Sequence, residues 1–107
     1  MKNKPDSRSN PTDSNNLEKK TEHYEKITAK ALGIVTVFPN LSAEKKAQAN
    51  DFLDLAKRYF DDARYFRQKG DLATALAAFS YAHAWLDAGV RGKILDGKQN
   101  DKLFVLP

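Results

Sequence analysis

The sequence predicts an all-α protein, a three-helix up-and-down bundle with a disordered N-terminal tail and a short C-terminal tail. Apolar residues recur at steps of three and four through most of the chain, which is the period of an amphipathic helix. Only five glycines and four prolines occur among 107 residues, and alanines, which favour helix, gather in the second half. A chain of this length holds a single domain with one modest core.

The expected organisation is a polar tail over residues 1–13, a bundle over 14–96 and a C-terminal tail over 97–107. The first thirteen residues are rich in Lys, Asn, Ser, Asp and Pro, and they have little to bury, so we expect them to be disordered. The expected helices cover residues 14–38, 43–69 and 72–92.

The first helix is expected to begin near Asp13 or Ser14, because a short polar side chain there caps free backbone amides. Gly33 and the β-branched residues after it weaken the last turn, and Pro39 ends the helix. A buried seam with heptad spacing is predicted from Leu17, Tyr24, Ile27, Ala31, Ile34 and Phe38.

The second and third helices are predicted to form an antiparallel hairpin. Ser42 is suited to cap the second helix, Gly70 to end it and Asp71 to cap the third at once. A junction this short forces the two helices to lie antiparallel. The stripe expected to be buried on the second helix comprises Ala49, Phe52, Leu53, Ala56, Tyr59, Phe60, Ala63 and Phe66. That on the third comprises Leu72, Ala75, Leu76, Phe79, Ala82, His83, Leu86 and Val90.

The opposite side of the third helix is also apolar, where an exposed helix usually carries lysine and glutamate. Its residues are Ala73, Ala77, Tyr81, Ala84 and Ala88, with Trp85 at the border. Either neighbouring helices cover this helix on both sides, or it offers a smooth surface to a partner. The apolar run at residues 103–106 either folds back over the bundle or docks on another chain.

Two resemblances follow. The hairpin resembles one tetratricopeptide unit at Tyr59, Ala63, Phe66, Gly70, Asp71, Leu72, Ala75, Phe79 and Ala82. Asp87 stands where that unit has its closing proline, and one unit does not make a solenoid. A more specific resemblance, over roughly residues 20–95, is to a family of small archaeal proteins called domain of unknown function 357, carried by RYFDDARYF at 58–66, KGD at 69–71 and ALAAFSYAHAWLDAGVR at 75–91. It implies a three-helix bundle and brings no activity or functional residues.

Ser80, His83, Asp87 and Arg91 are spaced to lie along one edge of the third helix. They can be drawn as a nucleophile, base and orienter, but mid-helix amides are already bonded and offer no oxyanion hole. We therefore expect a structural role, with His83 bonded to Asp87 or to a tyrosine of the second helix, and Arg91 paired with Asp87. An enzyme centred on His83 and Asp87 is the third hypothesis.

No cofactor and no metal are expected. The chain has no cysteine, which excludes disulfides, thiolate catalysis and cysteine-ligated zinc. A metal site at His83 and Asp87 would need further ligands, and His23 belongs to another helix.

The leading hypothesis is a non-enzymatic interaction or scaffold module that binds an unknown protein or a second copy through the third helix. The alternative is an RNA-associated accessory protein, because the net charge is +4 and basic residues neighbour aromatic ones. Its candidate residues are Arg58, Arg64, Arg67, Arg91 and Lys93. Asp61 and Asp62 would repel phosphate. The chain lacks a signal-peptide core and an apolar stretch of membrane length, so we expect a cytoplasmic protein without membrane contact.

Overall fold

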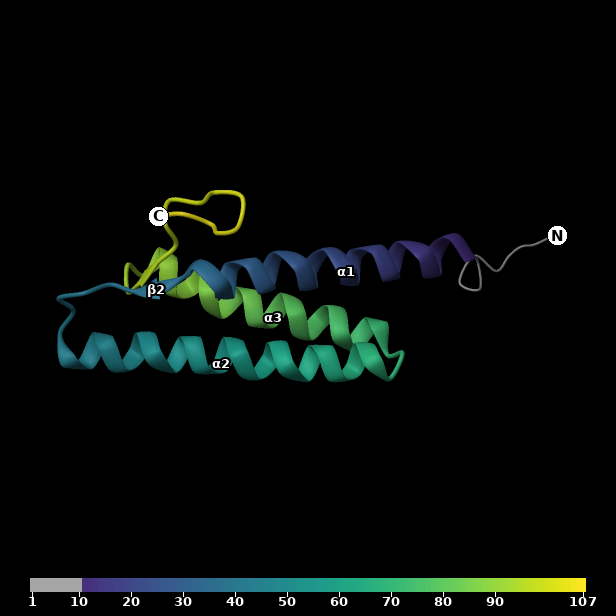
Figure 1. Cartoon of the computed structure of the whole chain (residues 1–107), viewed down its shortest axis with the longest axis horizontal. Coiled ribbons are helices and arrows are strands. Elements are labelled where there is room, and N and C mark those ends of the chain that lie inside the picture. The colour runs from purple at the N-terminus through teal and green to yellow at the C-terminus, as the bar shows by residue number, and fades with distance from the viewer. Residues whose placement is uncertain (1–10) are drawn as a thin grey trace.

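The computed structural model describes residues 11–107 as three helices and a short two-stranded ribbon (Figure 1). The helices are α1 (Pro11–Ile34), α2 (Ala43–Gln68) and α3 (Leu72–Arg91). Strand β2 (Thr36–Val37) pairs antiparallel with β3 (Leu95–Asp96). The predicted all-α bundle is confirmed.

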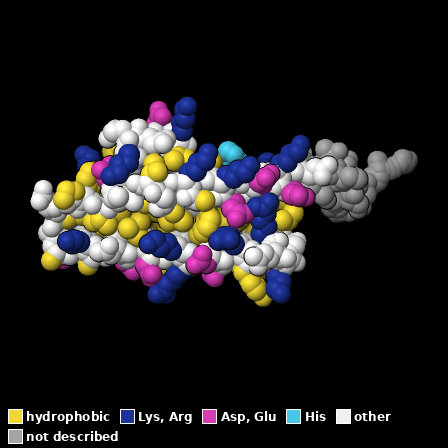
Figure 2. All heavy atoms as spheres, viewed as in Figure 1, with side chains coloured by type: hydrophobic (Ala, Val, Ile, Leu, Met, Phe, Trp, Pro, Cys, Tyr) yellow, Lys and Arg dark blue, Asp and Glu magenta, His cyan; other side chains and the backbone are white. Residues whose placement is uncertain are grey.

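Helix α3 is the central element of the bundle. It packs against both α1 and α2, whereas α1 and α2 make few contacts with each other, as the ribbon shows (Figure 1). Ala49, Ala56 and Ala63 are fully buried at heptad spacing on α2, and their small side chains let the α2 and α3 backbones approach closely. On the face shown in Figure 2, hydrophobic side chains form a band between α1 and α2, bordered by charged residues.

The caps of the α2–α3 hairpin form as predicted. The Ser42 hydroxyl accepts a hydrogen bond from the Lys45 amide, and the Asp71 carboxylate accepts one from the Thr74 amide, both at 3.2 Å. Gly70 has φ 83°, a left-handed conformation that most residues adopt only at a cost. These local signals fix the hairpin at both helix ends.

The predicted bounds of the first helix were wrong at both ends. Helix α1 ends at Ile34 instead of residue 38, because the β-branched residues after Gly33 leave the helix and Thr36–Val37 pair with β3. It begins at Pro11, a residue whose fixed φ suits the first helical position. Residues 11–13 of the expected disordered tail are therefore helical, and residues 1–10 lie outside the described part of the chain.

The predicted seam of α1 was right at Ala31, which is fully buried in the main core, but wrong in the middle of the helix, where other residues are buried. Thr21 and Thr28 are fully buried, whereas Tyr24 is 37% exposed and Ile27 is half-buried. The Thr21 hydroxyl donates to the Leu17 carbonyl at 2.7 Å, and Thr28 bonds His83 of α3. Since both hydroxyls have partners, burying them carries little penalty.

The C-terminal tail folds back on the bundle, which decides between the two alternatives left open for it in this chain. Phe104 is only 3% exposed and belongs to the main core, with Leu103 and Leu106 packed against that core. Gly97 makes room for it, because a Cβ at this position would lie 2.8 Å from Phe104 Cδ2.

We expect Gly89→Ala to destabilise the protein by about 1–3 kcal/mol, as overpacking does in well-packed cores. A Cβ at Gly89 would lie 2.3 Å from Cδ1 of Leu95, a core residue of β3. The measurement is urea unfolding followed by circular dichroism. Gly33→Ala is the matched control: nothing lies within 4 Å of its Cβ, so alanine should stabilise the helix, by up to about 1 kcal/mol. Equal effects of the two substitutions would contradict this account.

Candidate functional site

Both ring nitrogens of His83 have protein partners. Nε2 lies 2.5 Å from the Leu103 carbonyl oxygen, and Nδ1 lies 3.0 Å from the Thr28 hydroxyl oxygen. A carbonyl only accepts, so Nε2 carries the proton, and in the neutral ring Nδ1 accepts from the hydroxyl. The imidazole is 8% exposed. It therefore joins α1, α3 and the C-terminal tail through one buried side chain.

Asp87 and Arg91 continue this row toward the end of α3. The Val105 amide donates to Asp87 Oδ1 at 3.0 Å, and Arg91 Nη1 donates to the Leu106 carbonyl at 2.7 Å. Three side chains at successive turns of α3 thus contact main-chain groups of residues 103–106. We call His83, Asp87 and Arg91 the α3 ladder.

The structure places the predicted polar cluster on one edge of α3, but not with the predicted partners. Ser80 is exposed and contributes nothing to the ladder. The expected bonds from His83 to Asp87 or a tyrosine, and from Arg91 to Asp87, were wrong, because Thr28 and the tail supply the partners instead. Sequence reasoning missed Thr28; its heptad spacing from Thr21 was the available signal.

The small-residue side of α3 is uncovered in the single chain, although α1 and α2 flank the helix. We call this surface the alanine face; its exposed members are Ala73, Ala77, Tyr81, Ala84 and Ala88, with Trp85 half-buried at the border. Helix α3 packs between α1 and α2, as one of the two alternatives expected (Figure 1). Both contacts lie away from its small-residue side, which stays exposed in the single chain.

Aromatic side chains join the alanine face to α2. Tyr81 meets Tyr59 edge to face at 4.5 Å between ring centroids, and Trp85 meets Phe52 at 5.1 Å. Such pairs add stability beyond the area they bury. The Trp85 indole nitrogen is buried and has no hydrogen-bond partner within the described part of the chain. Trp85 is therefore a packing residue between the two helices as well as a border of the free face.

A shallow groove runs beside Tyr81 where α2 meets α3. Its volume is about 390 Å³. Its lining is mostly apolar and aromatic, with one acidic side chain, Asp62, and the hydroxyls of one threonine and two tyrosines. The lining residues are Tyr59, Asp62, Phe66, Thr74, Ala77, Ala78 and Tyr81. The groove extends the alanine face onto α2.

A larger hollow, of about 590 Å³, lies near the strand ribbon. Leu106 and Pro107 form part of its wall, together with Phe38 and Leu41. At its edge, the backbone amide of Lys98 donates to the Asp96 carboxylate at 2.8 Å and lowers the pKa of Asp96 below its ordinary value of 3.8. The shape of this hollow depends on the seated tail.

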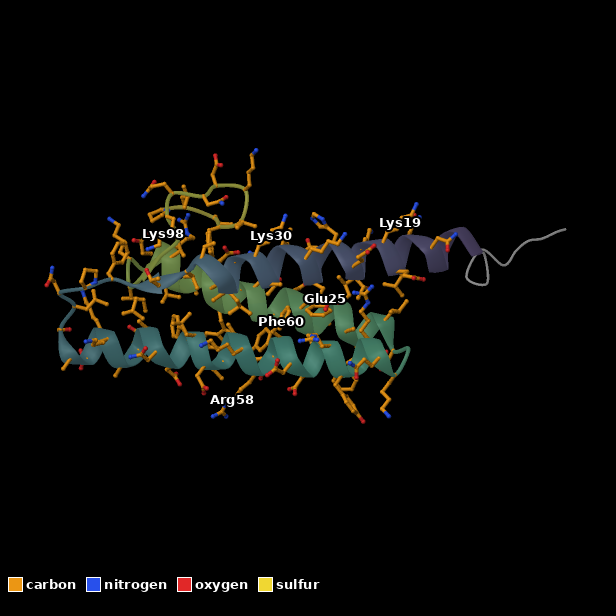
Figure 3. The ribbon with its side chains drawn as sticks, in the orientation of Figure 1. Lys19, Glu25, Lys30, Arg58, Phe60 and Lys98 are labelled. Carbon is orange, nitrogen blue, oxygen red and sulfur yellow. The ribbon has the colours of Figure 1, made fainter. Side chains whose placement is uncertain are left out.

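The basic residues considered for RNA binding do not gather on one face, and acidic partners occupy several of them. Arg58 pairs with Asp54 at 2.9 Å. Arg64 and Arg67 of α2 both approach the Glu25 carboxylate of α1, and Figure 3 marks the position of Glu25. Glu25 and Arg67 are far apart in the sequence, so the pattern of local charges gave no sign of this bridge.

The comparisons with known proteins identify a family. The sequence model of the family described as "Protein of unknown function (DUF357)" matches residues 23–95. No curated protein and no solved structure matches the chain. Within residues 11–107, no helix is both long and apolar enough to cross a membrane, and no three His, Cys, Asp or Glu side chains are grouped so as to hold a metal ion.

Proposed function

This chain belongs to the DUF357 family of proteins of unknown function, and we propose that it is a non-enzymatic interaction module that pairs with a second copy of itself through the alanine face. The observation that carries the proposal is the exposed side of α3. Over the length of that helix, Arg91 is its one charged exposed residue. Apolar surface in such a continuous patch is typical of a contact site.

The chemistry of the alanine face favours another helix as the partner. Alanine side chains are short, so two helices meeting at Ala77, Ala84 and Ala88 approach more closely than helices with large residues at the contact. Tyr81 stands among them, 48% exposed, and supplies a large apolar contact with a hydroxyl that reaches water. A smooth face with one projecting aromatic suits a complementary helix.

Charge at the two ends of α3 favours a second copy running antiparallel. A twofold axis at Tyr81 places residues equally distant from it in sequence opposite each other. Arg91 then faces Asp71, the exposed N-cap, since each lies ten residues from Tyr81. Trp85 faces Ala77 in the same way, a large side chain against a small one. The face is thus complementary to itself.

The contact is small, so we expect a weak dimer. A helix of 20 residues is about 30 Å long, and one pair of such helices buries less than the roughly 1,600 Å² of a standard interface. The groove beside Tyr81 adds contact area on α2. The dimer is therefore to be measured at hundreds of micromolar.

We expect Ala84→Glu to abolish this dimer. In the antiparallel pair each new carboxylate lies within the buried contact, opposite Ala78 of the other copy, and an unpaired buried charge is strongly unfavourable. The measurement is sedimentation equilibrium over a wide concentration range. The variant should stay monomeric and keep the circular dichroism spectrum of the original chain.

Ala29→Glu is the matched control, because Ala29 is exposed on α1 and outside the proposed contact. It makes the same chemical change and should leave association unaltered. A chain that is monomeric at the highest concentrations without any substitution, or equal effects of the two variants, would overturn the proposal.

We do not propose an RNA-associated role, because Arg58, Arg64, Arg67 and Arg91 are engaged by Asp54, Glu25 and the Leu106 carbonyl. The proposal places the module in the cytoplasm, a compartment that suits a chain without cysteine.

A further inference from the structure

Residues 103–107, the last part of the C-terminal tail and from here on called the tail, are held by the α3 ladder through their main chain. The contacts are to the carbonyls of Leu103 and Leu106 and to the amide of Val105. Each of these groups is present in every extended peptide, so the ladder recognises backbone direction and spacing. This is how a binding site for a peptide segment is built.

Phe104 is the side chain that anchors the tail. It is 3% exposed, lies against the His83 ring with centroids 6.2 Å apart, and fills the space left by the missing side chain of Gly97. The anchor and the ladder together make a complete site, with one deep apolar pocket and a row of polar contacts beside it.

The loop that returns the tail to this site is strained. Lys98 and Gln99 have φ of 60° and 59°, and two successive residues other than glycine in the left-handed region are unusual. The reversal is held by polar contacts: Asn100 Oδ1 accepts from the amides of Lys102 and Leu103, both at 3.1 Å. The two left-handed residues therefore disfavour the seated conformation of the tail, and the Asn100 contacts offset part of that cost.

We propose that the tail site also binds the tail of a second copy, so that two copies exchange residues 103–107 reciprocally. The contacts of the seated tail with the α3 ladder and the core are preserved in the exchanged form, because donor and acceptor groups are identical in the two copies. The loop extends in that form and its strain is released, as occurs in hinge loops that favour exchange. His83 and Asp87 of the ladder lie outside the alanine face, and Arg91 is the one residue that both contacts use. The experiment below therefore separates this inference from the proposed function.

The loop strain sets the protein concentration above which exchange between two copies competes with seating of the tail in its own chain. A segment on a short flexible linker has an effective concentration of about 1 mM for its own site. Each left-handed residue disfavours the seated form about fivefold or more. Two such residues lower the effective concentration of the tail for its own site from about 1 mM to tens of micromolar. Exchange is thus expected in concentrated protein after gentle warming and cooling.

Disulfide trapping tests the exchange directly, because the chain has no cysteine of its own. Asp87→Cys is made in one full-length chain and Val105→Cys in another that also carries a mass tag. The two are mixed at hundreds of micromolar, warmed, cooled and oxidised. We expect a disulfide-linked heterodimer on a non-reducing gel, at least tenfold above the yield from Val105→Cys mixed with Ala29→Cys.

Two further variants keep the test decisive. The double variant with both cysteines in one chain should close internally at low concentration, which shows that the pair is close enough to bond. If it closes while the mixed chains give only the yield of the Ala29→Cys control, the exchange proposal is overturned. Lys98→Gly with Gln99→Gly removes the strain and should lower the heterodimer yield about tenfold; an unchanged yield would overturn the hinge argument.

One further variant distinguishes the tail exchange from the alanine-face dimer. Ala84→Glu in both chains should leave the heterodimer yield unchanged, because the tail site does not include Ala84. A yield lost with Ala84→Glu would assign the cross-link to the alanine face and overturn exchange as an independent contact.

Discussion

Phe79→Ala is expected to destabilise the protein by about 3–5 kcal/mol. The Phe79 ring is fully buried, meets Phe60 at 5.4 Å between centroids, and packs with Ala63 and Ala75 in the cluster near the α2–α3 turn. The other fully buried residues of this cluster are alanines, which are too small to fill the cavity. Small domains are stable by about 5–15 kcal/mol, so this single change removes a large share of the total.

Urea unfolding followed by circular dichroism measures this loss, with fluorescence of the single tryptophan, Trp85, as a second probe. Tyr65→Ala is the control, since Tyr65 is also an aromatic residue on the hairpin but is 55% exposed. It should cost less than about 1 kcal/mol. Similar costs for the two substitutions would mean that the cluster around Phe79 is not a packed core.

His83→Leu is expected to destabilise the protein by about 2–4 kcal/mol and to release the tail. The change leaves the fully buried Thr28 hydroxyl without a partner, which costs about 1–3 kcal/mol. It also removes the hydrogen bond that holds the Leu103 carbonyl of the tail. Limited proteolysis should then cut residues 98–107 in the otherwise folded variant. Urea unfolding gives the free energy.

A double-mutant cycle identifies the Thr28 contribution. Thr28→Val combined with His83→Leu removes both polar partners from the α1–α3 contact and replaces them with apolar groups. We expect the combined loss to be smaller than the sum of the single losses, since the variants share one interaction. Strictly additive losses, or an intact tail in His83→Leu, would show that His83 does not join these elements.

The hairpin was predictable because its signals are local. Ser42, Gly70 and Asp71 act on backbone groups within a few residues of themselves, and the stripe on α2 has one unambiguous apolar side. Helix α1 carries two candidate sides, one with Tyr24 and Ile27 and the other with Thr21 and Thr28. The choice between them depends on the His83 partner for Thr28, which is distant in sequence.

Of the two candidate surfaces, one could likewise be predicted from local sequence and the other could not. The alanine face was predictable from the composition of α3, since the side opposite the core stripe carries almost no charge. The partners of the α3 ladder were not predictable, because Thr28 lies 55 residues before His83 and the tail groups lie 15–20 residues beyond the ladder across a reversal. That reversal depends on left-handed Lys98 and Gln99, residues that give no local sign of such a conformation.

The position of α1 has a consequence for the order in which the molecule opens. This helix is attached mainly to α3, through a contact that includes two buried threonines, and touches α2 chiefly where Glu25 meets Arg64 and Arg67. Helix α1 makes fewer contacts with the rest of the bundle than α2 and α3 make with each other, so α1 forms the less stable cooperative unit. Its amides would exchange with solvent through a partial opening that leaves the hairpin and the alanine face intact.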